Sequence, residues 1–233
     1  MAALNFRGTD FGNPRLLLNT AVCLLLGLIA SAAVAADAYQ RVIDQVARGY
    51  AILGRQDVLQ DEVALRTFLP ADEVAKRKER PSPGLIVGRF NNDRFLDFAA
   101  LVVNRSIKGE GPDRKGHFAG RLVVCLGTNA PQQYRCEILP TLYGDFIRLP
   151  YWADLELFKV IGEIECGTVG ETIKAYYPEG WRGKRPSSGE RDIPALKLRP
   201  NYDAIGEYAV GSNLGRTLVR RADGVYLDCA DAD

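Results

Sequence analysis

The sequence predicts an α+β fold, in which N-terminal helices precede a mainly antiparallel β-sheet or sandwich that is cross-linked by disulfides. Residues after Asp37 carry apolar side chains at helical spacing. Beyond Gly84 the chain becomes a series of short β-branched and aromatic runs separated by Gly, Asn, Asp or Pro. Cysteines follow a leading apolar segment, as in exported proteins. The 233 residues are 47% hydrophobic and 25% charged, which is the composition of a folded protein.

Residues 1–36 are organised like a signal peptide. A short polar lead precedes the apolar stretch LLLNTAVCLLLGLIASAAVAA, and Ala33-Val34-Ala35 fits the small-x-small pattern that signal peptidase reads. The alternative is an uncleaved membrane anchor, although Asn19 and Thr20 interrupt the apolar run. The sequence therefore predicts a periplasmic or secreted protein, which contacts a membrane only if this segment is retained.

Removal of that segment leaves a neutral chain, because the 30 basic and 29 acidic residues fall to 28 of each. No long run of one sign occurs, so we expect no nucleic-acid partner.

The segment 37–83 is expected to be helical. Its first helix should end near Gly54, and the basic run KRKER is read as a solvated helix end, with an interaction patch as the alternative. Prolines in RPSPG then close the segment. The apolar positions of the first helix are Tyr39, Val42, Ile43, Val46 and Tyr50.

The segment 84–233 is expected to be one β-rich domain. Its predicted strands are GLIVGRF, LDFAALVV, HFAGRLVVCLG, YRCEIL, ETIKAYY, ALKL, AIGEYAV, TLVRR and GVYLDC. Asp223-Gly224 signals a hairpin turn, and Pro178 to Pro194 is read as an exposed loop.

Four cysteines remain after cleavage, which suggests two disulfides, although four cysteines permit three pairings. Cys125 and Cys136 flank a turn-like segment between two strands, so this pair is favoured. Cys166 is then left to pair with Cys229.

The segment GRFNNDRFLDFAALV places oxygen-bearing side chains at alternate positions before an apolar strand. It resembles a single FG-GAP or VCBS-type repeat, and the closing segment after Pro194 is similar to that of small exported bacterial proteins with one such repeat. The resemblance implies a calcium loop in which Asn91, Asp93 and Asp97 would be ligands. Arg89, however, replaces the first acidic ligand, and Arg94 replaces a turn glycine.

The two added positive charges oppose a cation, so we expect no cofactor, with calcium as the alternative. Arg89 is instead expected to serve as the counter-charge of Asp93 or Asp97. A chance resemblance of an ordinary polar hairpin also stays open.

No catalytic residue is predicted. His117 follows a glycine and has no nucleophile nearby in sequence. Because it is the one histidine in the sequence, metal clusters of His and Cys are excluded. Glu163 and Glu165 would share one face of a strand and could split acid and base roles, but a solvent-facing strand gives the same pattern.

Two segments concentrate aromatic residues near arginine, the residue types that dominate protein interfaces. One runs from Thr141 to Phe158, and the other runs from Ala175 to Arg185. The second is preferred as the exposed one, with Tyr177, Trp181 and Arg182 as the partner-binding residues.

These observations predict an exported, non-enzymatic binding or accessory protein of the inhibitor, immunity or envelope-associated type. Its partner would be a protein or an envelope component. The alternative is a periplasmic hydrolase that uses carboxylates or His117.

Overall fold

The computed structural model describes residues 37–59, 62–79, 82–110, 116–130, 133–160, 162–167, 169–182, 190–209 and 215–229. The predicted signal peptide, with Ala33-Val34-Ala35, lies outside the described residues. The strands and sites below belong to one compact unit, Gln40–Asp233.

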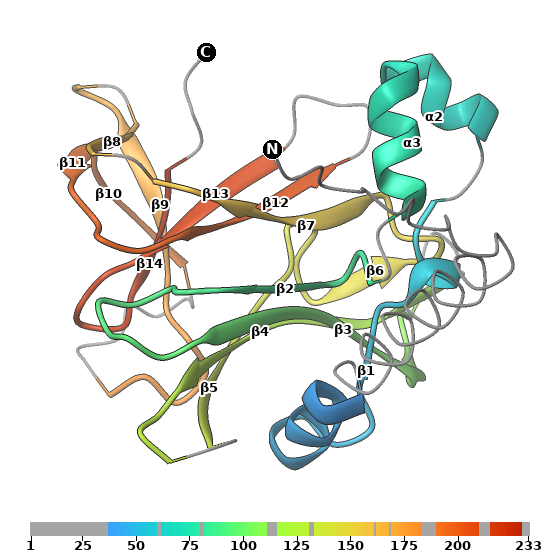
Figure 1. Cartoon of the computed structure of the whole chain (residues 1–233), viewed down its shortest axis with the longest axis horizontal. Coiled ribbons are helices and arrows are strands. Elements are labelled where there is room, and N and C mark those ends of the chain that lie inside the picture. The colour runs from blue at the N-terminus through green and yellow to red at the C-terminus, as the bar shows by residue number, and fades with distance from the viewer. Residues whose placement is uncertain are drawn as a thin grey trace, which may run out of the picture. The chain divides into compact units, whose positions relative to one another are not determined.

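Three antiparallel sheets make up most of the structure, as the predicted β-rich class requires (Figure 1). The first has the order β1-β3-β4-β5, with β2 also paired to β3 and β6 to β4. The second has the order β10-β9-β14-β13-β12-β7, and β8 pairs with β11 in a small third sheet.

The bounds follow chain order. The first sheet contains β1 (Ala51–Ile52), β2 (Leu85–Gly88), β3 (Asp97–Lys108), β4 (His117–Gly127), β5 (Tyr134–Leu139) and β6 (Phe146–Arg148). The second contains β7 (Ala153–Phe158), β9 (Thr172–Tyr176), β10 (Glu190–Pro194), β12 (Ala204–Ala209), β13 (Gly215–Arg220) and β14 (Tyr226–Asp228). The third contains β8 (Ile164–Cys166) and β11 (Leu196–Leu198).

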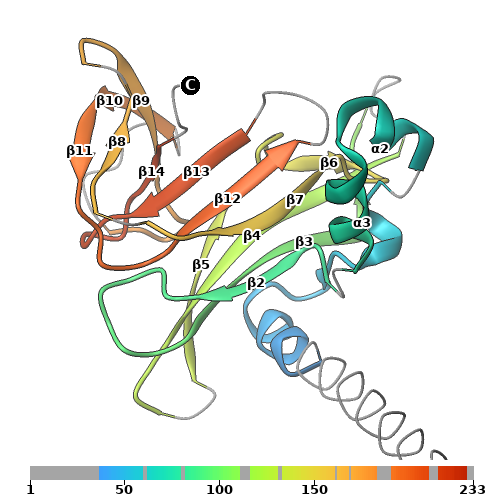
Figure 2. The same cartoon turned by 45° about the horizontal axis from the view of Figure 1, so that its top comes forward.

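The two large sheets pack face to face around one core (Figure 2). Alternate residues of β3 and β4, such as Leu101 and Leu122, point inward and meet Ile205 and Leu218 from β12 and β13. This inward alternation is the period-2 pattern of a half-buried strand.

A second core lies on the other side of the second sheet. Ile173 and Leu227 from that sheet pack with Ile164 of β8, and the disulfide Cys166–Cys229 links the same layers. The structure is thus a sandwich with a small third layer.

Both disulfides pair as the sequence favoured. Cys125 and Cys136 are direct partners in the β4–β5 register, whereas Cys166 and Cys229 are 63 residues apart. Two disulfides suit an oxidising, extracytoplasmic environment.

Helical residues lie at 37–46, in η1 (Arg55–Asp57), α2 (Glu62–Phe68) and α3 (Ala71–Glu79). The first helical run ends at 46 and not near Gly54, which corrects the prediction. Gly49 adopts a φ of +83°, and Ala51–Ile52 then pair with β3 as a strand. Within the described residues, no helix is both long and apolar enough to cross a membrane.

The predicted loop Pro178 to Pro194 is also corrected in part, because β10 (Glu190–Pro194) pairs with β9 along five residues. The hairpin turn at Asp223-Gly224 is confirmed. Gly224 has a φ of +83° between β13 and β14.

Candidate functional site

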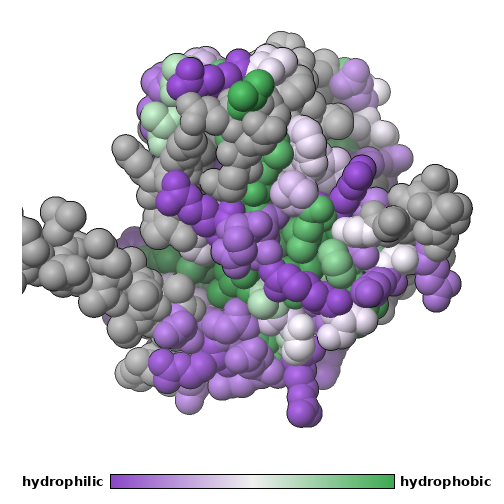
Figure 3. Space-filling view, turned by 90° about the vertical axis from the view of Figure 1, so that its right-hand side faces the viewer, coloured by the Kyte–Doolittle hydropathy of each residue, from purple (hydrophilic) through white to green (hydrophobic). Residues whose placement is uncertain are grey.

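A pocket of about 630 Å³ lies where β6 joins β4 and the chain turns into β7. Figure 3 views the molecule from the side on which β6 lies in Figure 1, and it shows apolar surface exposed between hydrophilic side chains. The pocket is lined by His117, Tyr143, Asp145, Phe146, Arg148, Tyr151 and Trp152.

Strand pairing fixes two of these side chains opposite each other. In the β4–β6 register, His117 is the partner of Arg148, and Ala119 is the partner of Phe146. Ile147, between the two lining residues of β6, is buried in the main core. Strand alternation therefore directs Phe146 and Arg148 to the pocket face.

A tight turn before β6 presents Tyr143. The backbone of Thr141 and Gly144 exchanges two hydrogen bonds of 3.0 and 2.9 Å, and Gly144 takes a φ of +86°. The Thr141 hydroxyl also donates to the Gly144 carbonyl over 2.7 Å. The turn leaves Tyr143 46% exposed at the rim of the pocket.

Tyr151 forms the floor, because it is only 1% exposed. Its backbone N–H donates to the Asp57 carbonyl over 2.6 Å, and its hydroxyl donates to Glu207 Oε1 over 2.7 Å. Burial, and then the charge of Glu207, raise the pKa of Tyr151 well above its ordinary value. This phenol therefore stays protonated and fixed in place.

A buried ion pair lies beneath that floor. Arg216 donates from Nε and a terminal nitrogen to Glu207 Oε2 over 3.1 and 2.7 Å, and its terminal nitrogen also donates to the Pro140 carbonyl over 2.6 Å. The Leu142 N–H donates to the other Glu207 oxygen over 3.0 Å. Glu207 thus ties β12 and β13 to the turn that carries Tyr143.

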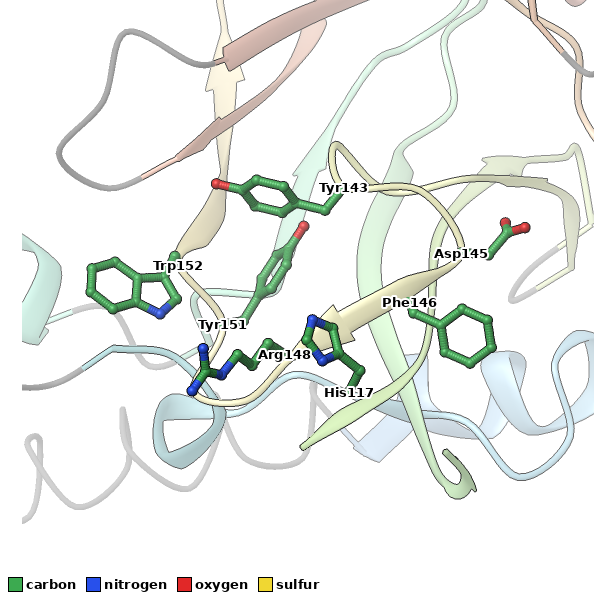
Figure 4. Close-up of a pocket in the computed structure, with 7 residues that line it drawn as sticks. All are labelled: His117, Tyr143, Asp145, Phe146, Arg148, Tyr151 and Trp152. Carbon is green, nitrogen blue, oxygen red and sulfur yellow. The ribbon is translucent and has the colours of Figure 1, made fainter. Parts of the chain in front are cut away.

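Trp152 follows the buried floor residue and is 40% exposed. Tyr143 meets Tyr151 edge to face, with ring centroids 5.8 Å apart. In Figure 4 these three aromatic side chains and Arg148 gather on one side of His117, while Phe146 and Asp145 lie on the other. The pocket therefore offers flat apolar surface beside a cation.

The charges of the pocket are unequal. Asp145 pairs with Arg121 at 3.0 Å, so its carboxylate is already compensated. Among the described residues Arg148 has no ion-pair partner, and the Nδ1 atom of His117 is buried without a hydrogen-bond partner. Such a group is stabilised by a partner that can hydrogen bond to it.

This arrangement is suited to binding. Among the lining residues that the structure describes, none is a serine, threonine or cysteine, and the carboxylate, Asp145, is paired with Arg121. A hydrolytic triad requires a nucleophile and an orienting carboxylate beside the general base, and the described lining residues do not supply this set.

The predicted calcium-type loop connects β2 and β3, but its side chains divide into two sets. Asp97 is 1% exposed and accepts backbone hydrogen bonds from Phe90 (2.6 Å) and Gly127 (2.8 Å). Asp93 accepts from the side-chain amide of Asn91 and, over 2.8 Å, from the backbone of Phe95. Burial raises the pKa of Asp97.

The expected role of Arg89 is corrected by these contacts. In the described loop its side chain forms no ion pair with Asp93 or Asp97, since backbone N–H groups satisfy Asp97 instead. The backbone of Arg89 exchanges hydrogen bonds of 3.0 and 2.6 Å with Asp203 and so joins the loop to the second sheet. Across the described part of the chain, no three His, Cys, Asp or Glu side chains come together as a metal site.

The predicted partner-binding residues are partly used in packing. Trp181 donates its indole N–H to the Asp223 carbonyl over 3.0 Å and meets Tyr177 edge to face at 4.8 Å. Both rings pack against the second core, whereas Arg182 is exposed. Of the two aromatic segments, the first is therefore the one with the more exposed rings among the described residues.

The carboxylates considered for catalysis are paired with cations. Lys197 lies opposite Glu165 in the β8–β11 register and pairs with it, and Arg199 donates to Glu163 over 2.9 Å. The hydrogen bond from Arg199 lowers the pKa of Glu163. A carboxyl group with a lowered pKa is a poor general acid.

Sequence reasoning grouped Tyr143, Phe146, Tyr151 and Trp152 with Arg148 but preferred the other aromatic segment. The signal in the sequence that could have favoured this segment was the placement of its aromatic residues around two turns, because rings at turns stay near the surface. No protein-family model, curated protein or solved structure matches the chain.

Proposed function

We propose that the chain is an exported, periplasmic, non-enzymatic binding protein and that the pocket beside β6 is its binding site. The observation that carries this proposal is the exposure of Tyr143 and Trp152, 46% and 40%, at a 630 Å³ pocket. Pockets of this size, lined by aromatic side chains and a few polar groups, are typical ligand sites.

Export is supported by the two disulfides and by the organisation of residues 1–36. The resemblance of the 88–102 segment to an FG-GAP or VCBS-type repeat of small exported bacterial proteins supports the same compartment. In this proposal the loop is a structural turn held by Asp97 and needs no calcium ion.

The alternative, a periplasmic hydrolase, has weaker support. Glu163 and Glu165 are held by Lys197 and Arg199, and His117 faces Arg148 instead of a carboxylate.

Photo-cross-linking in the envelope tests the proposed binding site. A photoreactive amino acid replaces Trp152 in the full-length protein, and a control chain carries it at Val169, which is 90% exposed and does not line the pocket. We expect a discrete adduct from position 152 in the periplasmic fraction and none from position 169.

Equal labelling at both positions, or none at position 152, would contradict the binding site. A parallel screen on ester, glycoside and peptide substrates separates the two functions. Turnover by the wild-type protein that is lost in His117→Ala would favour the hydrolase.

A further inference from the structure

The unbalanced charge of the pocket indicates what its ligand must carry. His117 and Arg148 face each other across the β4–β6 register, and Arg148 has no carboxylate partner among the described residues. An anion placed between them would be the counter-charge, and a guanidinium can donate two parallel hydrogen bonds to a carboxylate.

The acidic groups near the pocket do not supply this charge. Asp145 is paired with Arg121 at 3.0 Å, and the guanidinium of Arg121 is also 3.4 Å from Glu179. Glu207, below the floor, is fully buried and is compensated by Arg216 at 2.7 Å. Arg148 is exposed, so water can solvate it in the free protein, and an anion bound beside it would come from outside these residues.

His117 provides a second polar side chain at the pocket beside Arg148. Its Nδ1 atom is inaccessible to solvent and has no hydrogen-bond partner among the described residues, so a ligand in the pocket would contact the other ring nitrogen, Nε2. A ligand with several acceptor oxygens can receive hydrogen bonds from both His117 and Arg148.

The aromatic side chains indicate the shape of the remainder. Tyr143 and Trp152 present partly exposed rings on the same side of His117 as Arg148 (Figure 4). Ring faces stack on planar groups and on the apolar faces of rings. A pocket of about 630 Å³ accommodates a compact ligand of one or two rings.

We infer that the pocket binds a carboxylate carried on a ring, with Arg148 and His117 holding the carboxylate and Trp152 and Tyr143 stacking on the ring. This inference rests on the proposed binding function. Two sources share the chemistry, namely aromatic acids and uronic acids.

Isothermal titration of the purified exported protein tests the inference with benzoate and D-glucuronate as probes. Benzyl alcohol and D-glucose are the matched neutral controls. For ligands of this size we expect a dissociation constant of about 1 mM for at least one acid. Binding of benzoate alone assigns an aromatic acid, binding of glucuronate alone assigns an acidic sugar, and binding of both supports the shared chemistry.

Arg148→Gln should weaken binding of the acid by about tenfold or more, since it removes a charge-assisted hydrogen bond. The matched control Arg48→Gln removes an exposed arginine that is not among the lining residues and should leave binding unchanged. In a Trp181→Phe protein, Trp152 is the remaining tryptophan, so the bound acid should change its fluorescence. Thermal unfolding of each variant checks that it is folded.

The inference would be overturned if neither acid bound at about 20 mM, which is well above the dissociation constant expected for such ligands. It would also be overturned if the neutral analogues bound equally well, or if Arg148→Gln left the affinity for the acid unchanged. If cross-linking at position 152 succeeds while both acids fail, the binding function stands and only the ligand class is wrong. If both experiments fail, the pocket is not the binding site.

Discussion

The ion pair beneath the pocket gives the sharpest prediction about stability. Glu207 and Arg216 have side chains that are 0% and 1% exposed, so neither charge can be solvated if its partner is lost. The substitution Glu207→Gln keeps the size of the side chain but removes its charge. Breaking a buried pair in this way costs about 3–5 kcal/mol of unfolding free energy, because it leaves an uncompensated charge.

The geometry supports the upper part of that range. Glu207 accepts hydrogen bonds from the Tyr151 hydroxyl, the Leu142 N–H and two nitrogens of Arg216. A glutamine has only one acceptor oxygen, so its amide N–H₂ must face a donor on one side. The substitution therefore removes a charge and also places donors against each other.

Urea unfolding followed by tryptophan fluorescence, with the disulfides intact, measures the effect. We expect a lower midpoint with an unchanged m-value. The control Glu179→Gln removes a carboxylate that is 63% exposed and 3.4 Å from Arg121, and it should cost less than about 1 kcal/mol.

A double-mutant cycle with Arg216→Met completes the test. The double variant should be less destabilised than the two single variants together by about 2 kcal/mol or more, because it no longer holds an unpaired charge. A loss below about 1 kcal/mol for Glu207→Gln would refute the reasoning, as would additive effects in the cycle.

Three further predictions concern the rest of the molecule. Burial, and then nearby carboxylates, raise the pKa of Tyr151 and Tyr226 above the ordinary 10.0, so their contribution to stability is complete below pH 10 and is lost as the pH rises toward the folded-state pKa. Above pH 10 the free energy of unfolding, measured with urea, should fall by about 2.7 kcal/mol per pH unit for the two phenols, and each Tyr→Phe variant should reduce that slope. Asp97→Ala should lower the free energy of unfolding by about 2–5 kcal/mol in the same assay, because it leaves two backbone N–H groups unpaired. Calorimetric titration of the wild-type protein with calcium should give no micromolar binding, and a micromolar site would show that the loop is a metal site. Replacing Cys166 and Cys229 by alanine should lower the free energy of unfolding by about 4 kcal/mol, and replacing Cys125 and Cys136 should lower it by about 3 kcal/mol, because the closed loops are 63 and 11 residues long. The reverse order would contradict this account.

Much of the strand pattern could be predicted because β-branched residues and turn signals coincide. The predicted runs at β4 and β5 match the observed strands at both ends. The strand β7 was not predicted, since Leu155, Glu156 and Leu157 are helix formers. Its pairing with β12 along six residues outweighs that local preference.

The candidate site could be predicted only in part. The sequence showed which segments were rich in aromatic residues, but exposure decides between them and depends on tertiary partners. Trp181 finds the Asp223 carbonyl, 42 residues away, whereas Trp152 sits at a pocket rim. The pairing of His117 with Arg148 likewise comes from strand register, which a single sequence does not fix.

Native mass spectrometry of the protein isolated from the periplasmic fraction tests the central claim, that this pocket holds a ligand. The account predicts an added mass on the wild-type protein and on Arg48→Gln, and the bare chain for a Trp152→Ala, Arg148→Gln double variant. A bare wild-type protein, or an added mass that persists in the double variant, would contradict it.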